Sequence, residues 1–101
     1  MKVFLSHQMS GLSEEKVYQI RKTALDFLQS KYGQIEVIDN YHHKNVPDNA
    51  GRLWHLGTSI RMMEQADLIY FCEGWTNAKG CLIEKAICDV YKLNYEINGG
   101  L

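Results

Sequence analysis

The stretch from Asp67 to Glu84, DLIYFCEGWTNAKGCLIE, decides the fold of this chain. Its first part, Leu68 to Cys72, is an apolar run whose length and composition suit a buried strand. Regular spacing then stops at Gly74, Asn77 and Gly80. From Gly80 onward, apolar residues recur at helical spacing: Ile83, Ala86, Ile87 and Val90. The stretch therefore predicts a strand, a loop and a helix.

The same two patterns alternate along the rest of the chain. Strands are predicted at Val3–Ser6, Ile35–Ile38 and, as a short last strand, Tyr95–Ile97. One helix is expected to begin after the N-cap residue Ser13, and another to run from Arg52 to Gln65. Their apolar stripes are Val17, Ile20, Ala24, Phe27 and Leu28 in the first, and Leu53, Leu56, Ile60 and Met63 in the second.

This alternation of strands and helices predicts an α/β fold. We expect a small doubly wound, flavodoxin- or Rossmann-like parallel sheet of about four strands flanked by helices, with right-handed crossovers. The expected strand order is 2-1-3-4, and residues 1–101 are expected to form a single domain.

Composition excludes several classes of protein. The formal net charge is -1 and the 11 basic residues form no run, so we expect no nucleic acid polymer and no membrane surface as a partner. No apolar segment is long enough to cross a membrane, and residues 1–5 are too short for a signal-peptide core, so a cytoplasmic protein is expected. The three cysteines form no C-x-x-C pair and are expected to be buried reduced thiols. No cofactor and no metal site are expected.

Ligands of open α/β sheets bind at the carboxyl ends of the strands, near the point where the strand order reverses. Three polar loops are predicted to meet there: residues 6–11, the long irregular segment 39–51, and residues 73–84. Their aromatic, amide and carboxylate side chains suit a small polar ligand with a flat ring. The residues concerned are Ser6, His7, Gln8, Ser10, Gly11, Asp39, Asn40, Tyr41, His42, His43, Glu73, Trp75, Asn77, Gly80 and Glu84.

Each candidate also has a structural alternative. Glu84, beside the apolar stripe in the first turn of its helix, also suits an acid that stabilises the helix dipole. His42–His43 looks like half a metal site, but adjacent side chains point apart and no third ligand is evident, which favours a solvated loop. Trp75 fits a pocket rim or a packed position, and Gly11 and Gly80 also suit ordinary turns.

Three segments resemble the nucleoside 2-deoxyribosyltransferase-like superfamily. Lys2–Gly11, KVFLSHQMSG, resembles its opening K-[IV]-[YF]-L-A-G-P-M-[ST]-G, and Ala66–Phe71 resembles its A-D-x-[IV]-V strand. Gly80–Ala86, GCLIEKA, resembles its G-T-x-x-E-x-G-[YR]-A motif. Over nearly its full length the chain resembles, more closely, a small uncharacterised family of phage and bacterial proteins in that superfamily. Asn40–Gly57 matches the N-Y-H-H-x-N-x-P-x-N-A-G-R-L-W-H-L-G stretch of that family.

The resemblance implies a covalent mechanism on a nucleoside or nucleotide. A glutamate carboxylate attacks the anomeric carbon and releases the base, and a second base or water then takes the sugar. By motif match the nucleophile would be Glu84, and Asp67 would hold or protonate the base. The opening loop, with Ser6, His7, Gln8, Met9, Ser10 and Gly11, would lie along the sugar or phosphate. From the other two loops, the expected substrate-binding residues are Asn40, His42, His43, Trp75, Asn77 and Gly80.

The chain also departs from the superfamily pattern. Asn77 stands where an acid is common, Phe4 lacks the hydroxyl of the usual tyrosine, and His7-Gln8 replaces Gly-Pro. Cys81 also replaces threonine. Three hypotheses therefore remain. The first is a deoxyribosyltransferase or N-glycosidase, and the second is a non-catalytic module that binds a nucleotide or nucleotide-derived signal. The third is a structural or interaction protein.

Assembly is expected as well. The superfamily resemblance and the apolar residues of the predicted helix 52–65, among them Trp54, Leu56 and Ile60, favour a homo-oligomer.

Overall fold

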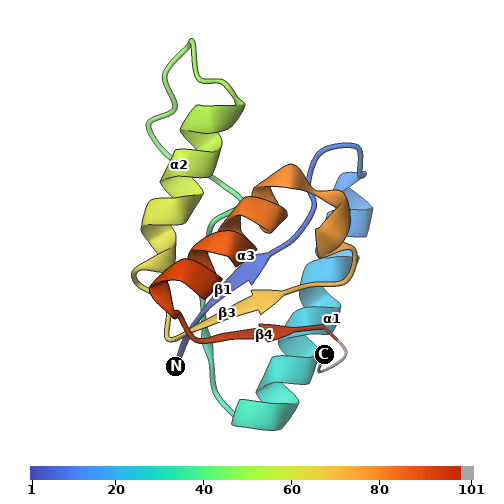
Figure 1. Cartoon of the computed structure of the whole chain (residues 1–101). Coiled ribbons are helices and arrows are strands. Elements are labelled where there is room, and N and C mark those ends of the chain that lie inside the picture. Colours follow the sequence, from blue (N-terminus) through green and yellow to red (C-terminus); the bar gives the residue numbers. More distant parts are fainter. Residues whose placement is uncertain (99–101) are drawn as a thin grey trace.

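Four short strands form one parallel sheet in the computed structural model, which describes residues 1–98 (Figure 1). The strands are β1 (Lys2–Ser6), β2 (Glu36–Ile38), β3 (Leu68–Phe71) and β4 (Tyr95–Ile97). Their order is β2-β1-β3-β4, and β1 pairs with β3 in a register that sets Ser6 beside Phe71. The predicted fold class, strand direction and strand order are confirmed.

Three α-helices and one 3-10 turn connect the strands: α1 (Glu14–Tyr32), α2 (Arg52–Met63), η1 (Trp75–Asn77) and α3 (Lys79–Tyr91). The hydroxyl of Ser13 accepts a hydrogen bond from the Lys16 amide, as expected for an N-cap. Gly33, with φ at 81°, takes the positive φ that glycine tolerates and ends α1. Helix α2 ends at Met63, two residues earlier than the sequence predicted.

The helices cover both faces of the sheet, α1 on one and α2 with α3 on the other (Figure 1). Successive strand residues point to opposite faces, so β1 contributes Val3 and Leu5 to the α1 side and Phe4 to the other side. This alternation continues at the end of β1 and decides where the polar residues there point.

Two predicted stripe residues, one on α1 and one on α2, are exposed. Phe27 is 45% exposed and Leu53 is 81% exposed, whereas Leu28, next to Phe27, is fully buried. Phe27 lies beside the buried row of α1, and Leu53 lies in the first turn of α2, away from the buried residues Ser59 and Met63 near its other end.

The predicted apolar stripe of α3 was wrong except for Ile87, which packs partly against the core. Its buried residues are Cys81, Glu84 and Cys88, while Ile83 and Val90 are exposed. Spacings of three and four residues place the two small thiols and Glu84 on one face of the helix. Glu84 is tolerated in this row because its carboxylate is hydrogen-bonded. It also lies in the second turn, since the helix begins at Lys79, and not in the first as predicted.

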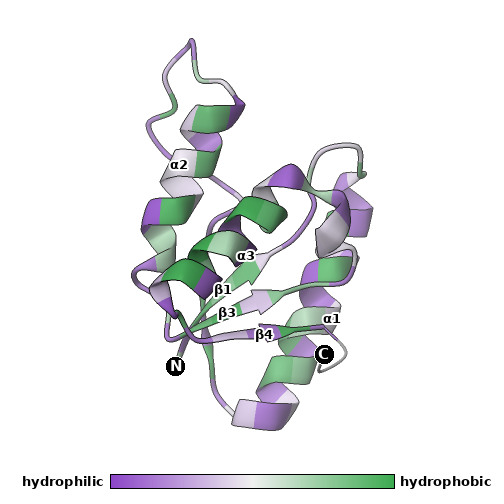
Figure 2. Cartoon of the chain, in the orientation of Figure 1, coloured by the Kyte–Doolittle hydropathy of each residue, from purple (hydrophilic) through white to green (hydrophobic). Residues whose placement is uncertain are grey.

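An apolar surface therefore remains on the outward side of α3. Figure 2 shows hydrophobic bands along this helix, which lies in front of the sheet in that view. The exposed apolar residues are Leu82, Ile83, Val90 and Tyr91. None of the helices within residues 1–98 combines the length and the apolar character needed to span a membrane.

Candidate functional site at the carboxyl edge of the sheet

Buried polar side chains gather at one edge of the sheet. Residues 1–98 include five buried polar or charged residues, and four of them lie around the carboxyl end of β1: Ser6, His7, Asn40 and Glu84. Burying a polar group is costly unless it finds a hydrogen-bond partner. Within residues 1–98, every buried side-chain nitrogen or oxygen has such a partner. The cluster is thus built at the edge where the topology predicts a ligand site.

The first contact joins the end of β1 to α3. The hydroxyl of Ser6 donates a hydrogen bond of 2.6 Å to Oε1 of Glu84, and both side chains are buried. Burial raises the pKa of Glu84 to about 7, although the hydrogen bond from Ser6 works in the opposite direction. The described contacts of this carboxylate use Oε1 alone, so Oε2 is left for solvent or a ligand.

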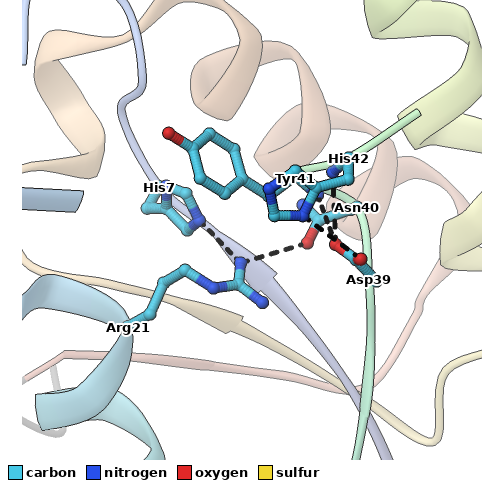
Figure 3. Close-up of polar contacts among 6 residues, drawn as sticks. All are labelled: His7, Arg21, Asp39, Asn40, Tyr41 and His42. Carbon is cyan, nitrogen blue, oxygen red and sulfur yellow. Dashed lines mark hydrogen bonds and ion pairs between the residues drawn. The ribbon is translucent and has the colours of Figure 1, made fainter. Parts of the chain in front are cut away.

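The second contact lies on the other face of the sheet, where Arg21 reaches over from α1 (Figure 3). Its Nη1 lies 2.8 Å from Nε2 of His7 and 3.5 Å from Oδ1 of Asn40. The Asn40 amide donates in turn to the backbone oxygen of Leu5 at 2.9 Å. Three separate elements, β1, α1 and the segment after β2, are thereby tied together.

Asp39 has a side-chain partner in His42, but Arg21 has no ion-pair partner among residues 1–98. Arg21 is partly buried, and within residues 1–98 no carboxylate lies at ion-pair distance from it. Burial lowers its pKa and the nearby Asp39 opposes this, but a guanidinium remains charged. Burial works to raise the pKa of Asp39, yet hydrogen bonds from His42 and Tyr41 outweigh it and hold that pKa below its ordinary range.

His7 is held as a neutral ring. Because Nε2 faces a guanidinium that can only donate, Nε2 must accept, and Nδ1 at 3.1 Å from the oxygen of Gln8 must carry the proton. Burial lowers the pKa of His7, in keeping with this state.

The rest of the first loop folds on itself beside the cluster. The Gln8 side chain donates to the backbone oxygen of Ser10 at 3.1 Å, and the Leu12 amide donates to Met9 at 3.3 Å. Gly11 has φ at 83°, so it is required by the turn.

The two adjacent histidines diverge. His42 Nδ1 lies 3.3 Å from Oδ2 of Asp39, near the network. His43 turns toward α2 instead, with its Nδ1 2.9 Å from Nδ1 of His55 and its Nε2 3.2 Å from the hydroxyl of Ser59. Across residues 1–98, no three histidine, cysteine or acidic residues are grouped so as to hold a metal ion.

The third loop supplies packing more than polar contacts. Trp75 is partly buried, with its ring centroid 5.1 Å from that of Phe71. Asn77 is exposed within η1. A Cβ added at Gly80 would lie 3.6 Å from Leu56, an ordinary contact, so this glycine marks where α3 approaches α2.

Asp67 is not brought together with Glu84. It precedes β3, and its carboxylate accepts a hydrogen bond of 2.7 Å from the Lys2 amide at the start of β1. The length of a strand, roughly 13 Å at 3.3 Å per residue, separates it from Phe71 at the other edge. Within one chain, Asp67 and Glu84 cannot contact the same sugar.

Arg21 is the residue that the sequence analysis missed. It was counted only as one of several scattered basic residues. Its position held a signal, because it lies four residues after Val17 and three before Ala24, both of which are buried. A charged residue on the buried side of a helix needs polar partners, and these are His7 and Asn40.

The larger of two surface hollows lies mostly away from the polar cluster. It has a volume of about 440 Å³ beside β2 and α2, and it shares only Asp39 and His42 with the cluster described above. A second hollow of about 300 Å³ runs along the flank of α1 and includes Arg21. The polar cluster, and not the larger hollow, marks the candidate site, because only there are buried ionisable groups brought together.

The fold and these contacts define a class: a small α/β domain with a buried polar site at the carboxyl edge of its sheet. The chain belongs to the family described as "Domain of unknown function (DUF4406)", whose model matches residues 1–95. No curated protein and no solved structure matches the chain.

Proposed function

We propose that this chain is a nucleoside- or nucleotide-processing enzyme of the deoxyribosyltransferase or N-glycosidase type, with Glu84 as nucleophile. On this proposal its family of phage and bacterial proteins falls within the nucleoside 2-deoxyribosyltransferase-like superfamily. One observation carries the proposal. Two segments that resemble the superfamily, 78 residues apart in the chain, meet through the 2.6 Å hydrogen bond between Ser6 and Glu84.

The contacts suit an attack by the carboxylate. Ser6 holds Oε1, so Oε2 is the oxygen that forms a bond to the anomeric carbon of the sugar. The bond from that carbon to the base nitrogen breaks with both electrons, and the departing base takes a proton from solvent. Water or a second base then attacks the same carbon and releases Glu84 as a carboxylate. Asp67 has no part in this scheme, because it lies at the opposite edge of the sheet.

The environment of Glu84 sets a pH requirement. Attack needs the ionised carboxylate, and a pKa of about 7 leaves the group only partly ionised at neutral pH. Base release should therefore increase as the pH rises from 6 to 8.

The test is base release, measured by chromatography, from nucleosides and nucleotides first selected by a thermal-shift screen. Glu84→Gln keeps the shape and removes the attacking charge, so release should fall by orders of magnitude while binding survives. Glu64→Gln is the matched control, because Glu64 is an exposed carboxylate between α2 and β3, at the edge of the sheet opposite Glu84. Equal release from wild type and Glu84→Gln would refute the nucleophile.

The alternative is a non-catalytic module that binds a nucleotide or a nucleotide-derived signal in the same site. Two observations favour it: Phe4 is fully buried in the core and offers no hydroxyl, and Asp67 is remote from Glu84. A ligand that binds wild-type protein without any base release would support this alternative and exclude the enzyme.

A further inference from the structure

We propose that the ligand of this site carries a phosphate that binds Arg21, so that the substrate class is a nucleoside monophosphate and not a free nucleoside. The inference rests on the proposed function, since it names the substrate of the same site. It adds a residue, Arg21, that the sequence motifs do not include.

Arg21 carries its positive charge in a partly buried position. A partly buried guanidinium without an ionic partner pays for desolvation and recovers little of it. His7 and Asn40 both contact Nη1, so the described contacts leave Nε and Nη2 without a partner. Those two nitrogens donate in the fork arrangement that suits two oxygens of one phosphate.

The groups that hold Arg21 in place are neutral. His7 must accept from the guanidinium and therefore carries no charge, and Asn40 offers an amide oxygen. The nearest acid, Asp39, is engaged by His42 and by the backbone amides of Tyr41 and His42 (Figure 3). Arg21 is thus fixed in position. The charge of Asp39 acts on it, but the described contacts use only Nη1, so Nε and Nη2 are left for an incoming anion.

Arg21 and Glu84 contact two consecutive residues at the tip of β1. Ser6 and His7 are consecutive, so their side chains leave the tip of β1 toward opposite faces of the sheet. Ser6 contacts Glu84 of α3, and His7 contacts Arg21 of α1. A ligand lying across the tip of β1 would reach both, with its sugar at Glu84 and its phosphate at Arg21.

The overall charge of the chain limits the size of the anion that would bind. The chain has a net charge of -1 and no basic run, so its surface does not suit a polyanion. One isolated guanidinium fits one small anionic group.

The experiment is titration calorimetry with adenosine, adenosine 5′-monophosphate, thymidine, thymidine 5′-monophosphate and inorganic phosphate. Wild-type protein should bind at least one monophosphate tenfold or more tightly than its nucleoside, and the preference should weaken as salt is raised. Arg21→Gln should abolish the preference, because it removes the charge that the phosphate would bind. Arg21→Lys, which keeps the charge without the fork, should retain part of it. Arg61→Gln is the control, because Arg61 is exposed near the end of α2 and contacts Thr58.

Each other outcome overturns the inference. Equal affinity for nucleoside and monophosphate, a preference that survives in Arg21→Gln, or no binding of any of these compounds would do so. Circular dichroism verifies that each variant is folded, and Arg21→Lys carries the comparison if Arg21→Gln is not. Because no arm measures turnover, the two proposals fail separately. If the protein releases base from free nucleosides and shows no phosphate preference, Glu84 stands as the nucleophile and the role of Arg21 is refuted. If it shows a phosphate preference without base release, the role of Arg21 stands and the nucleophile is refuted.

Discussion

At the scale of single residues, the structure changes the meaning of Glu84. The sequence left two interpretations open, a nucleophile and an acid in the first turn of a helix. Glu84 lies in the second turn, in the buried row of α3, with a hydroxyl from another element on its carboxylate. The effect of a helix dipole falls off within the first turn, so it does not account for this position.

This burial predicts a pH dependence of stability. The pKa of Glu84 is about 7 in the folded chain, against an ordinary value of 4.5. Between these values the folded chain retains a proton that the unfolded chain has lost, so the free energy of unfolding falls as the pH rises through this window. The loss amounts to at most about 3 kcal/mol, at 1.36 kcal/mol per pKa unit.

Urea unfolding of wild type and Glu84→Gln at pH 5 and pH 8 measures this effect. The variant cannot ionise here, so its stability relative to wild type should increase from pH 5 to pH 8. The other titrating groups, including His7 and Asp39, are common to both proteins and cancel in the difference. A difference that is independent of pH would show that Glu84 is not buried as described.

Residue types predicted part of the site and missed the rest. Ser6, His7, Asn40 and Glu84 were expected at the carboxyl edge because parallel topology brings the ends of the strands together. Arg21 was not, because a helix residue reaches this edge only through a long side chain. The divergence of His42 and His43 was expected from their adjacency, but the partners of His43 on α2 were not.

At the scale of elements, periodicity predicted where helices and strands occur better than which side of a helix is buried. The strand order follows from alternation and right-handed crossovers, which few topologies satisfy. Helix α3 carries apolar residues on both sides, and counting them favoured Ile83 and Val90 over the row of Cys81, Glu84 and Cys88. A glutamate can be assigned to the buried side of a helix only when its hydrogen-bond partner, here Ser6, is known.

Helix α1 offers a direct check of such a face. The sequence assigned both Phe27 and Leu28 to its apolar stripe, but only Leu28 is fully buried. Leu28→Ala should lower the free energy of unfolding by about 2–5 kcal/mol, because it leaves a cavity in the core. Phe27→Ala should cost less, under about 2 kcal/mol, since the ring is 45% exposed and packs only partly, against Tyr70. Denaturant unfolding of both variants decides, and a larger loss for Phe27→Ala would contradict this placement of α1.

At the scale of the whole molecule, the surface of α3 and the start of α2 suggests assembly. The sequence favoured a homo-oligomer formed through α2, yet α2 exposes one large apolar residue, Leu53, whereas α3 exposes Leu82, Ile83, Val90 and Tyr91. Clustered apolar side chains on the surface of a small domain favour association. We propose a homodimer formed through the outward face of α3 (Figure 2); Leu53 of α2 is exposed as well.

Sedimentation velocity at tens of micromolar tests this proposal. Wild-type protein should sediment as a dimer, and Val90→Glu should shift it to monomer, because it places a charge on the apolar face. Tyr18→Glu is the control, since Tyr18 is 65% exposed on α1, which covers the other side of the sheet. A wild-type protein that remains monomeric at this concentration would rule the dimer out.

The claim that Glu84 is the nucleophile is tested most directly by acid-quenched mass spectrometry during base release. Wild-type protein mixed with a nucleotide that it cleaves should show an added glycosyl mass, located on the peptide that contains Glu84. Glu84→Gln should bind the nucleotide, release its base at a rate lower by orders of magnitude, and show no adduct. Base release by Glu84→Gln at the wild-type rate, or an adduct on another residue, would contradict the assignment.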